Sequence, residues 1–276
     1  MKRIIIVLIS LISVASFAQK KEKIKGNKEV LIKEFSIPDF SAIEVGEKFK
    51  VAIQKTTDTT RIVIEADDNL FDVIHYSVTD KVLSFNTSKE IVKKKRLRIT
   101  VFVPKKFNSI TVKEKGQVFN KEDLAFDNIK ITASQHAEAD LNLQIKNNLV
   151  IDAADKTELV INGRAKSAKI HISANAEIKG NFSASTIDLD LDKHAYCNFE
   201  GSAKQLKLEA KSKSELKFKS FKVNNAAIHA YDKSNVIIHI SGNLELIATG
   251  SSSTEIYGSP KINLKSFKDN ATLYKK

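Results

Sequence analysis

The chain has 276 residues, a formal net charge of +12, one cysteine, three prolines and no tryptophan. A single cysteine excludes an internal disulfide, so stability must come from burial and backbone pairing. The few prolines argue against a proline-rich stalk, and the lack of tryptophan argues against a tryptophan platform for stacking sugars.

Residues 1–18 are typical of a signal peptide. Two basic residues precede an apolar run over residues 4–14, and Ser16 and Ala18 are spaced for signal peptidase. The run is shorter than the roughly 20 apolar residues that a bilayer-spanning helix needs. We therefore expect cleavage after Ala18 and no transmembrane segment in the mature chain, whose net charge is about +10. The mature protein is expected in the periplasm, at the outer membrane or outside the cell.

The first part of the mature chain is predicted to contain a leader and then β-strands. Residues 19–29 are polar and lysine-rich, which predicts a flexible leader. Residues 30–127 alternate apolar and polar side chains, as in FKVAI at residues 49–53, so we expect strands packed on, or continuous with, the region that follows. The basic run at residues 93–96 lies between two such strands. We interpret it as a solvated turn, or as charges that prevent an exposed edge strand from pairing with another chain.

Residues 128–276 carry a repeat of about 19–20 residues, in which two columns of residues keep the same period. The residues that enter a polar turn are Ala133, Ala153, Ser173, Leu191, Ala210, Ala230 and Ala248. The residues that restart the apolar pattern are Ala139, Leu159, Ile178, Cys197, Leu216, Val236 and Ile256. One coil cannot bury its apolar side alone, whereas stacked coils form a continuous core. The sequence therefore predicts an all-β fold with a single-stranded β-solenoid, expected to be a right-handed parallel β-helix.

A further pair of columns repeats charge instead of apolar residues. The acidic column contains Glu138, Glu158, Glu177, Glu215 and Glu255. The basic column, two residues earlier in the coils, contains His136, Lys156, His194, Lys213 and Lys233. Because side chains two apart on a strand share a face, we interpret these residues as a surface charge ladder. Carboxylates in a column are also able to hold Ca²⁺, but the glycine-rich calcium repeat is absent, so no metal is expected.

Asp188, Asp190 and Asp192 alternate with two leucines, which places three carboxylates on one face of a strand. Successive carboxylates are then about 7 Å apart, near the separation required for inverting glycoside hydrolysis. These are the candidate catalytic residues if the chain is an enzyme. The same alternation is typical of a solvated strand face, and no polygalacturonase-type signature accompanies it, so a non-enzymatic protein is favoured.

Other chemistry-bearing residues form no recognisable motif. The six histidines show no zinc-binding spacing, and the chain has no phosphate-binding loop or dinucleotide fingerprint, so no cofactor is expected. Cys197 falls in the apolar restart column, which predicts a small buried side chain instead of a reactive thiol.

Four segments carry a resemblance to a known family. They are FSIPDFSAIEVGEKFKVAI, RIVIEADDNLFDVIHYSVTDKVLSF, RLRITVFVPKKFNSITVKEKG and TGSSSTEIYGSPKI. Over about residues 35–265 the chain resembles the auto-transporter adhesin family with the head GIN domain, although it is richer in lysine. The resemblance implies a β-helical fold, an envelope or surface location in Gram-negative bacteria, and no catalytic residues.

These observations favour a non-enzymatic envelope or surface solenoid, an adhesin or interaction scaffold, with an envelope, matrix or polysaccharide partner. Export removes nucleic acid in the cell as a partner. Two alternatives remain at this point. One is a polysaccharide-acting hydrolase or lyase that uses the three aspartates, and the other is a polyanion-binding surface protein that uses the excess of lysine. The sequence does not indicate the oligomeric state.

Overall fold

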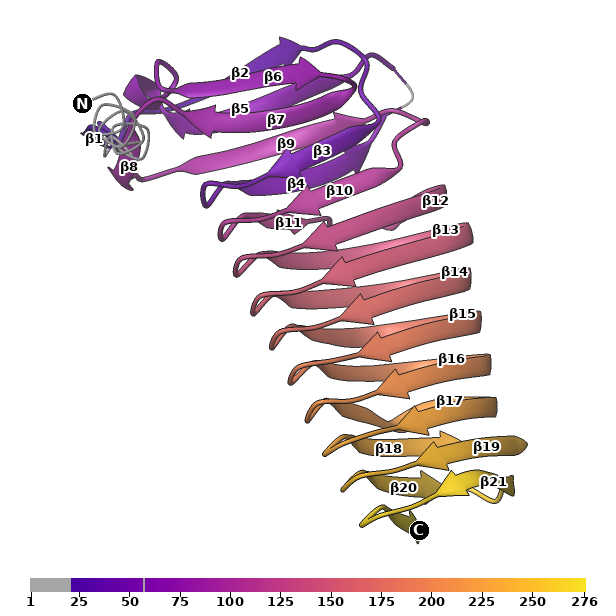
Figure 1. Cartoon of the computed structure of the whole chain (residues 1–276). Helices are drawn as coiled ribbons and strands as arrows, with labels where there is room; N and C mark the ends of the chain where they lie inside the picture. Colours follow the sequence, from indigo (N-terminus) through magenta and orange to yellow (C-terminus); the bar gives the residue numbers. More distant parts are fainter. Residues whose placement is uncertain (1–20, 57) are drawn as a thin grey trace, which may run out of the picture.

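The computed structural model describes residues 21–56 and 58–276, and the predicted signal peptide at residues 1–18 lies outside them. The described chain is a β-solenoid with a broader N-terminal unit at one end (Figure 1). Its helical content is a single 3₁₀ turn, η1 (Asp68–Leu70). The all-β prediction is confirmed.

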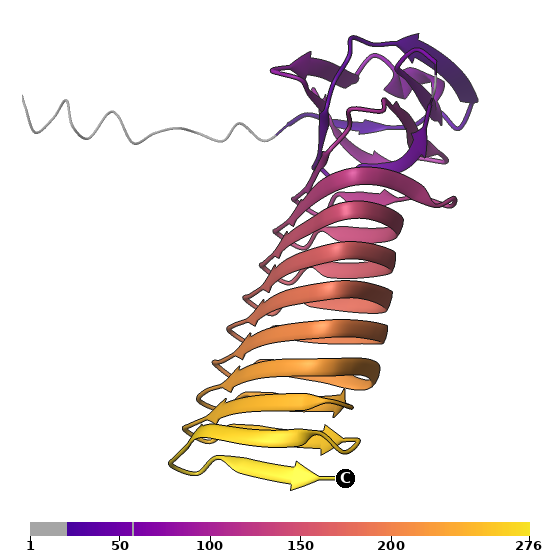
Figure 2. The same ribbon diagram turned by 90° about the vertical axis from the view of Figure 1, so that its right-hand side faces the viewer.

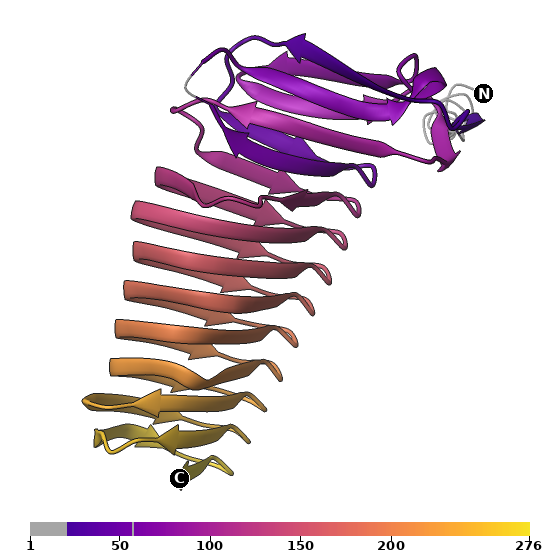
Figure 3. The ribbon, with the colours of Figure 1, turned by 180° about the vertical axis from the view of Figure 1, so that it is seen from behind.

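Each central coil consists of one long strand that passes through a wide bend, followed by a tight turn (Figures 1 and 3). We call the strand halves that lead into a tight turn the pre-turn sheet, and the halves that leave it the post-turn sheet. Neighbouring coils pair in parallel throughout. In Figure 1 the chain descends along the near sheet to the tight turns and returns along the far sheet, which makes the solenoid right-handed. The central strands are β13 (Glu138–Ala153), β14 (Glu158–Ile172), β15 (Glu177–Leu191), β16 (Tyr196–Ala210) and β17 (Glu215–Ala230).

The coils on either side of the central group are built from shorter strands. β12 precedes them, and β18 to β22 complete the solenoid with the same parallel pairing. These strands are β12 (Leu124–Ala133), β18 (Asn235–Ile240), β19 (Asn243–Ala248), β20 (Ser253–Tyr257), β21 (Lys261–Phe267) and β22 (Thr272–Lys275).

The coil geometry begins well before residue 128. β3 (Ala42–Val45) and β4 (Lys50–Lys55) already form a coil that pairs in parallel with β10 (Ser109–Val112) and β11 (Gln117–Phe119). Residues 56–108 are therefore inserted between two neighbouring coils. Together with the strands before residue 42, this insertion forms the broad unit at the N-terminal end and extends both sheets of the solenoid.

The inserted strands, with β2 from the segment before the first coil, extend each sheet by different pairings. In the post-turn sheet β4 pairs in parallel with β9, which pairs antiparallel with β5, and β5 pairs antiparallel with β2. In the pre-turn sheet β3 pairs in parallel with β7, which pairs antiparallel with β6. These strands are β2 (Val30–Ser36), β5 (Arg61–Asp67), β6 (Ile74–Thr79), β7 (Val82–Thr87) and β9 (Leu97–Val103).

Residues 21–29 are not a flexible leader. β1 (Lys23–Lys25) pairs in parallel with β8 (Glu90–Lys93). Ile24 packs against the core, and Asn69 Nδ2 donates a hydrogen bond to the Lys25 carbonyl oxygen at 2.8 Å. A single apolar side chain and a side-chain amide 44 residues away thus order a segment whose composition predicts flexibility.

The strand register corrects one member in each of the two predicted apolar columns. The column that enters the tight turns is Ala133, Ala153, Ile172, Leu191, Ala210, Ala230 and Ala248. The column that leaves them is Ala139, Leu159, Ile178, Cys197, Leu216, Val236 and Thr254. Both columns now advance by the same steps of 20, 19, 19, 19, 20 and 18 residues. Placing Ser173 and Ile256 in these columns was wrong, because the first site accepts a large buried residue and the last coil is shorter than the others.

Most tight turns use left-handed backbone at residues other than glycine, whereas Gly250, with φ of 69°, takes this conformation in the turn between β19 and β20. In successive coils two adjacent residues have positive φ, for example Gln135 and His136 (57° and 63°) and Asp155 and Lys156 (58° and 60°). Two such residues in a row are the signature of a type I′ turn, which suits the twist of the strands that it joins. Gly163 lies near a wide bend instead, with φ of 126°, and a Cβ there would collide with the carbonyl oxygen of Leu143.

Stacked aromatic rings fill the interior of the central coils. Phe182 and Phe199 have ring centroids 5.5 Å apart, and Phe199 and Phe218 have centroids 6.0 Å apart. All three side chains are fully buried. Such ring pairs add to the free energy of burial and fix the vertical register of the coils.

The C-terminal coil has no coil beyond it among the described residues. Ile262, Leu264 and Phe267 occupy inward positions of β21 but are 37%, 49% and 42% exposed. In this respect the C-terminal end differs from the N-terminal end, where the inserted strands cover the first coils.

Candidate functional site

The outer face of the pre-turn sheet presents polar side chains in vertical rows. One of them, the amide row, consists of Asn128, Asn148, Ser167, Thr186, Gln205, Asn225 and Asn243. At each end of the row the side chains bond to one another. Asn148 Nδ2 donates to Asn128 Oδ1 at 2.9 Å, and Asn243 Nδ2 donates to Asn225 Oδ1 at 2.9 Å. Such ladders hold the polar groups at fixed positions along the solenoid.

A cavity of about 420 Å³ lies along this face between β14 and β19, and we call it the axial groove. The row members from Ser167 to Asn243 form one wall, and Ala227 leaves space on the outer face because its side chain is small. Asp188, Lys207 and Glu245 add charges of both signs. The groove therefore offers donors, acceptors and charges to a polar partner that extends along the solenoid axis.

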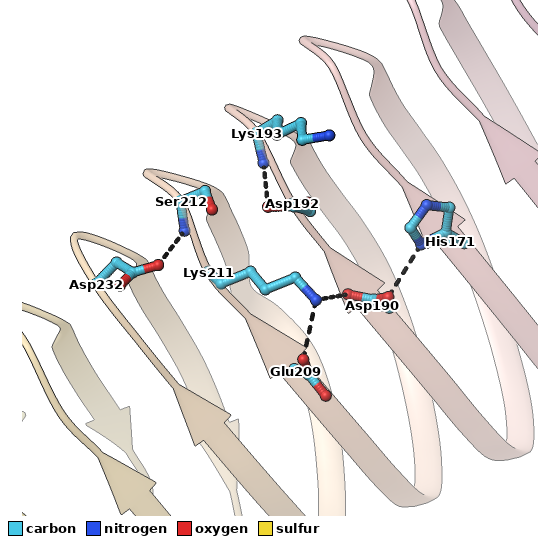
Figure 4. Close-up of polar contacts among 8 residues, drawn as sticks. All are labelled: His171, Asp190, Asp192, Lys193, Glu209, Lys211, Ser212 and Asp232. Carbon is cyan, nitrogen blue, oxygen red and sulfur yellow. Dashed lines mark hydrogen bonds and ion pairs between the residues drawn. The ribbon is translucent and has the colours of Figure 1, made fainter.

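Asp190 lies in a chain of ion pairs beside this groove (Figure 4). Its Oδ2 is 3.1 Å from Nδ1 of His171, and its Oδ1 is 3.7 Å from Nζ of Lys211. Lys211 also donates to Glu209 Oε1 at 3.0 Å. The bond to Glu209, with the nearby charge of Asp190, raises the pKa of the Lys211 ammonium. The carboxylate of Asp190 is thus held between two neighbouring coils.

The other two aspartates of the strand have different surroundings. Asp188 is exposed and lines the axial groove, whereas Asp192 stands at the entry to a tight turn and accepts a hydrogen bond from the Lys193 amide at 2.8 Å. The structure keeps the three carboxylates on one face, as expected, but does not gather them around one cavity. An acid and base pair acting on one glycosidic bond needs such a shared cavity.

The acidic members of the predicted charge ladder are in register except for one. Glu138, Glu158 and Glu177 are direct neighbours, followed by Tyr196 and Glu215. The prediction for Glu255 was wrong. Ser253 occupies that row, and Glu255 lies two residues further along, because the last coil is short.

The basic members of the ladder lie in the tight turns, not on the strand face. His136, Lys156, His194 and Lys213 have positive φ, and Lys233 lies in the equivalent turn between Tyr231 and Ser234. Over residues 21–56 and 58–276, no ion pair joins this row to the glutamate row. The turn redirects these side chains, so the expected pairing two residues apart was wrong.

Two of the glutamates pair instead with lysines on their own strands. Lys179 Nζ is 2.6 Å from Glu177 Oε2, and Lys217 Nζ is 3.2 Å from Glu215 Oε1. Hydrogen bonding to these carboxylates raises the pKa of both lysines. Both lysines also lie within 5.5 Å of the ring centroid of Tyr196, which takes the place of a glutamate in the row.

Neither a metal centre nor a reactive thiol is found in the described part of the chain. There, no three His, Cys, Asp or Glu side chains are placed to hold a metal ion together. Cys197 is fully buried in its apolar column, and burial raises the pKa of its thiol. Within the described residues, no helix is both long enough and apolar enough to cross a bilayer.

Sequence reasoning missed the amide row, although the sequence carries its signal. Its members recur five residues before the turn-entry column, as in Asn128 before Ala133 and Asn225 before Ala230. Their spacing follows the same period, but asparagine, serine, threonine and glutamine alternate, so no single residue type marks the row.

Solved structures that share this fold include the following three. A "putative adhesin" from Parabacteroides merdae has a TM-score of 0.64 at 17% identity and covers 92% of this chain and 99% of its own. A "putative lipid binding protein" from Parabacteroides distasonis has a TM-score of 0.64 at 12% identity, with 92% and 97% covered. A "putative adhesin" from Bacteroides fragilis has a TM-score of 0.54 at 18% identity, with 92% and 100% covered. At these identities the likeness shows the fold alone.

Sequence comparison gives the family. No curated protein matches the chain. The family described as "Putative auto-transporter adhesin, head GIN domain" matches residues 39–181 and 145–260, which together span most of the chain. The tight-turn solenoid, its N-terminal unit and these matches lead to one conclusion: the chain belongs to the auto-transporter adhesin family with the head GIN domain.

Proposed function

We propose that this protein is a non-enzymatic adhesin or interaction scaffold, exported to the cell envelope or surface, and that the pre-turn sheet holds its partner. The axial groove is the observation that carries the proposal. It combines amide, hydroxyl and charged groups across several coils, and a hydrogen bond joins the side chains of Asn225 and Asn243 at one end of the row.

The repeat of the solenoid indicates the kind of partner. Coils stack about 4.8 Å apart, so polar hydrogen-bonding groups recur at short, regular intervals along the groove. A partner that is itself a polar polymer, such as an envelope or matrix polysaccharide, is able to meet these groups repeatedly. Many weak contacts then add up to useful affinity without a deep pocket.

The surroundings of the aspartates support a scaffold over a polysaccharide-cleaving enzyme. Asp190 is engaged with His171 and Lys211, and Asp192 with its own turn. Asp188 is left as the one carboxylate of the three in the groove. The other carboxylate of the groove, Glu245, lies three coils away, at about 14 Å. The two carboxylates of an inverting or retaining hydrolase lie within about 9.5 Å of each other.

The groove is tested by filling it. Ala227→Arg places a long side chain in the groove, and Asn198→Arg places the same side chain on the outer face of the post-turn sheet as a control. Binding of the purified mature protein to a panel of envelope and matrix polysaccharides is measured by biolayer interferometry. We expect A227R to weaken binding at least tenfold and N198R to leave it unchanged. Equal binding by wild type and A227R would refute the role of the groove.

Two further measurements test the scaffold role itself and the alternative of a polysaccharide-cleaving enzyme. Deletion of the coding region should reduce attachment or matrix binding by the cells, and a deletion strain that matches wild type in envelope integrity, attachment and matrix binding contradicts the proposal. The same polysaccharide panel is assayed for cleavage by wild type and Asp190→Asn. Turnover by wild type that is lost in D190N would establish the enzyme instead.

A further inference from the structure

A second cavity, of about 370 Å³, lies on the wide-bend edge where the N-terminal unit meets the first long coils. The ribbon in Figure 2 has this edge turned toward the viewer. We call it the bend cleft. Lys55 ends β4, Lys105 follows β9, Lys146 lies in β13 and Arg164 in β14. Its size falls within the roughly 300–1,000 Å³ typical of ligand pockets.

The charge of the bend cleft is strongly one-sided. Four cationic side chains line it, with Asp127 as the one acidic side chain of the lining. None of the four cations is in an ion pair within residues 21–56 and 58–276, although lysines elsewhere pair readily, as Lys130 does with Asp152 at 3.2 Å. Like charges converging on a concave surface raise the local concentration of anions.

The walls fix part of this arrangement. Lys55 Nζ donates to the Ala125 carbonyl oxygen and lies 5.6 Å from the ring centroid of Phe126. Gln144 Nε2 donates to Asp123 Oδ2 at 2.9 Å, which orients its amide and occupies a nearby carboxylate. Gln144 Oε1 is buried and accepts no hydrogen bond from the described residues. The cleft is therefore a preformed cationic recess with an unmet acceptor in its wall.

The cationic character continues along the bend edge. Lys166 and Lys204 occupy equivalent bend positions two coils apart, because Ala165 pairs with Ala184 and Ala184 pairs with Ala203. Both lysines are exposed. An extended anionic chain seated in the cleft is able to follow this edge and meet further cations.

We infer that the bend cleft and this edge bind an acidic polysaccharide through its carboxylate or sulfate groups. A lipid surface is disfavoured, because none of the large hydrophobic side chains that are exposed in the described chain lines the cleft. A nucleic acid is disfavoured because Phe126, the aromatic residue of the lining, is buried and offers no exposed face for stacking bases. The inference is independent of the axial groove, which lies on a different face and has its own variant.

The experiment removes two cleft charges and compares the result with an equal loss elsewhere. Lys146→Gln with Arg164→Gln is the cleft variant. Lys193→Gln with Lys213→Gln is the control, because both lysines are exposed at tight turns on the opposite edge. Binding of polygalacturonate, dextran sulfate and neutral dextran is measured by isothermal titration calorimetry at low and high salt, after thermal melts confirm that each variant is folded.

We expect binding to at least one anionic polymer, none to neutral dextran, and a steep loss with salt. The cleft variant should bind about tenfold more weakly, in line with the loss of two exposed ion contacts, and the control less than about twofold more weakly. Polygalacturonate and dextran sulfate distinguish carboxylate from sulfate as the recognised group. Equal losses in both variants, salt-insensitive binding, or no binding to either anion would overturn the inference.

Discussion

Replacing Asp67 by asparagine tests how the N-terminal unit holds its basic segment. Asp67 ends β5 with 0% of its surface exposed. Its carboxylate accepts hydrogen bonds from three backbone amides: Arg96 at 2.8 Å, Lys95 at 3.0 Å to the nearer oxygen, and Lys28 at 3.2 Å. One side chain thereby joins the segment after β1 to the basic run that precedes β9.

The cost of Asp67→Asn follows from these contacts. The variant keeps one carbonyl oxygen, but its amide nitrogen faces backbone N–H groups and is unable to accept from them. At least one buried donor then loses its acceptor, and the charge that strengthens the other bonds is gone. Hydrogen bonds to charged groups contribute about 1.5–3 kcal/mol each, so we expect a loss of about 3 kcal/mol at pH 7. For a chain of this size that lowers Tm by about 6–12 °C.

The effect should depend on pH in a defined direction. Burial alone would raise the pKa of Asp67, but the hydrogen bonds from Lys95, Arg96 and Lys28 outweigh it and hold the pKa below the ordinary value of 3.8. The folded state therefore favours the ionised form, and the stabilisation is fully present above the ordinary pKa. It is lost as the pH falls through the lowered pKa of the folded state. Wild type and D67N should converge in stability in this acidic range.

Thermal melts followed by circular dichroism from pH 7 to pH 2.5 measure both effects. Asp68→Asn is the matched control, since the Asp68 side chain is 46% exposed and its ion pair with Lys33, at 3.7 Å, should contribute little. A D67N protein as stable as wild type at pH 7 would refute the reasoning. A difference between the two that stays constant down to pH 2.5 would refute the part assigned to the charge.

Three further predictions concern the solenoid. Phe199→Ala should cost about 3–5 kcal/mol, because it leaves a cavity in the ring stack; chemical denaturation measures it, and a loss below 1 kcal/mol would contradict the packing described. Gly163→Ala should cost at least about 2 kcal/mol from backbone strain and collision. Gly46→Ala should be nearly neutral in the same assay, because its backbone is ordinary and an added Cβ would meet only the movable side chains of Glu114 and Lys113, at 3.3 Å or more. Cys197 should react with a thiol reagent only after unfolding. Modification of the native protein would contradict this, because it would show that the core around Cys197 becomes accessible to solvent in the folded state.

The period of the solenoid could be predicted from sequence because every coil buries residues at the same positions. The exact register could not. Ile172, not Ser173, enters its tight turn, since stacking onto Ala153 and Leu191 outweighs the local preference for a small residue. The short last coil shifts the pattern again, which moved Glu255 out of the glutamate row.

The charged sites were harder to predict than the core. A ladder of paired charges assumes that alternation continues through the tight turn, but left-handed residues such as Lys156 and His194 break it. The bend cleft has no local signal at all, because Lys55 and Arg164 are over one hundred residues apart and meet only through the stacking of coils. Sequence periodicity describes positions within a coil, whereas such sites depend on which coils the insertion brings together.

The open C-terminal coil gives the molecule unequal ends. At the N-terminal end the inserted strands pair with the first coils, whereas β21 and β22 each pair on one side only within the described chain. In a stack where stability comes from neighbouring repeats, fraying should therefore start at the C-terminus and move inward coil by coil. Amide hydrogen exchange should then be fastest in β22 and slow progressively toward β13, so that the protein carries a gradient of local stability along its axis.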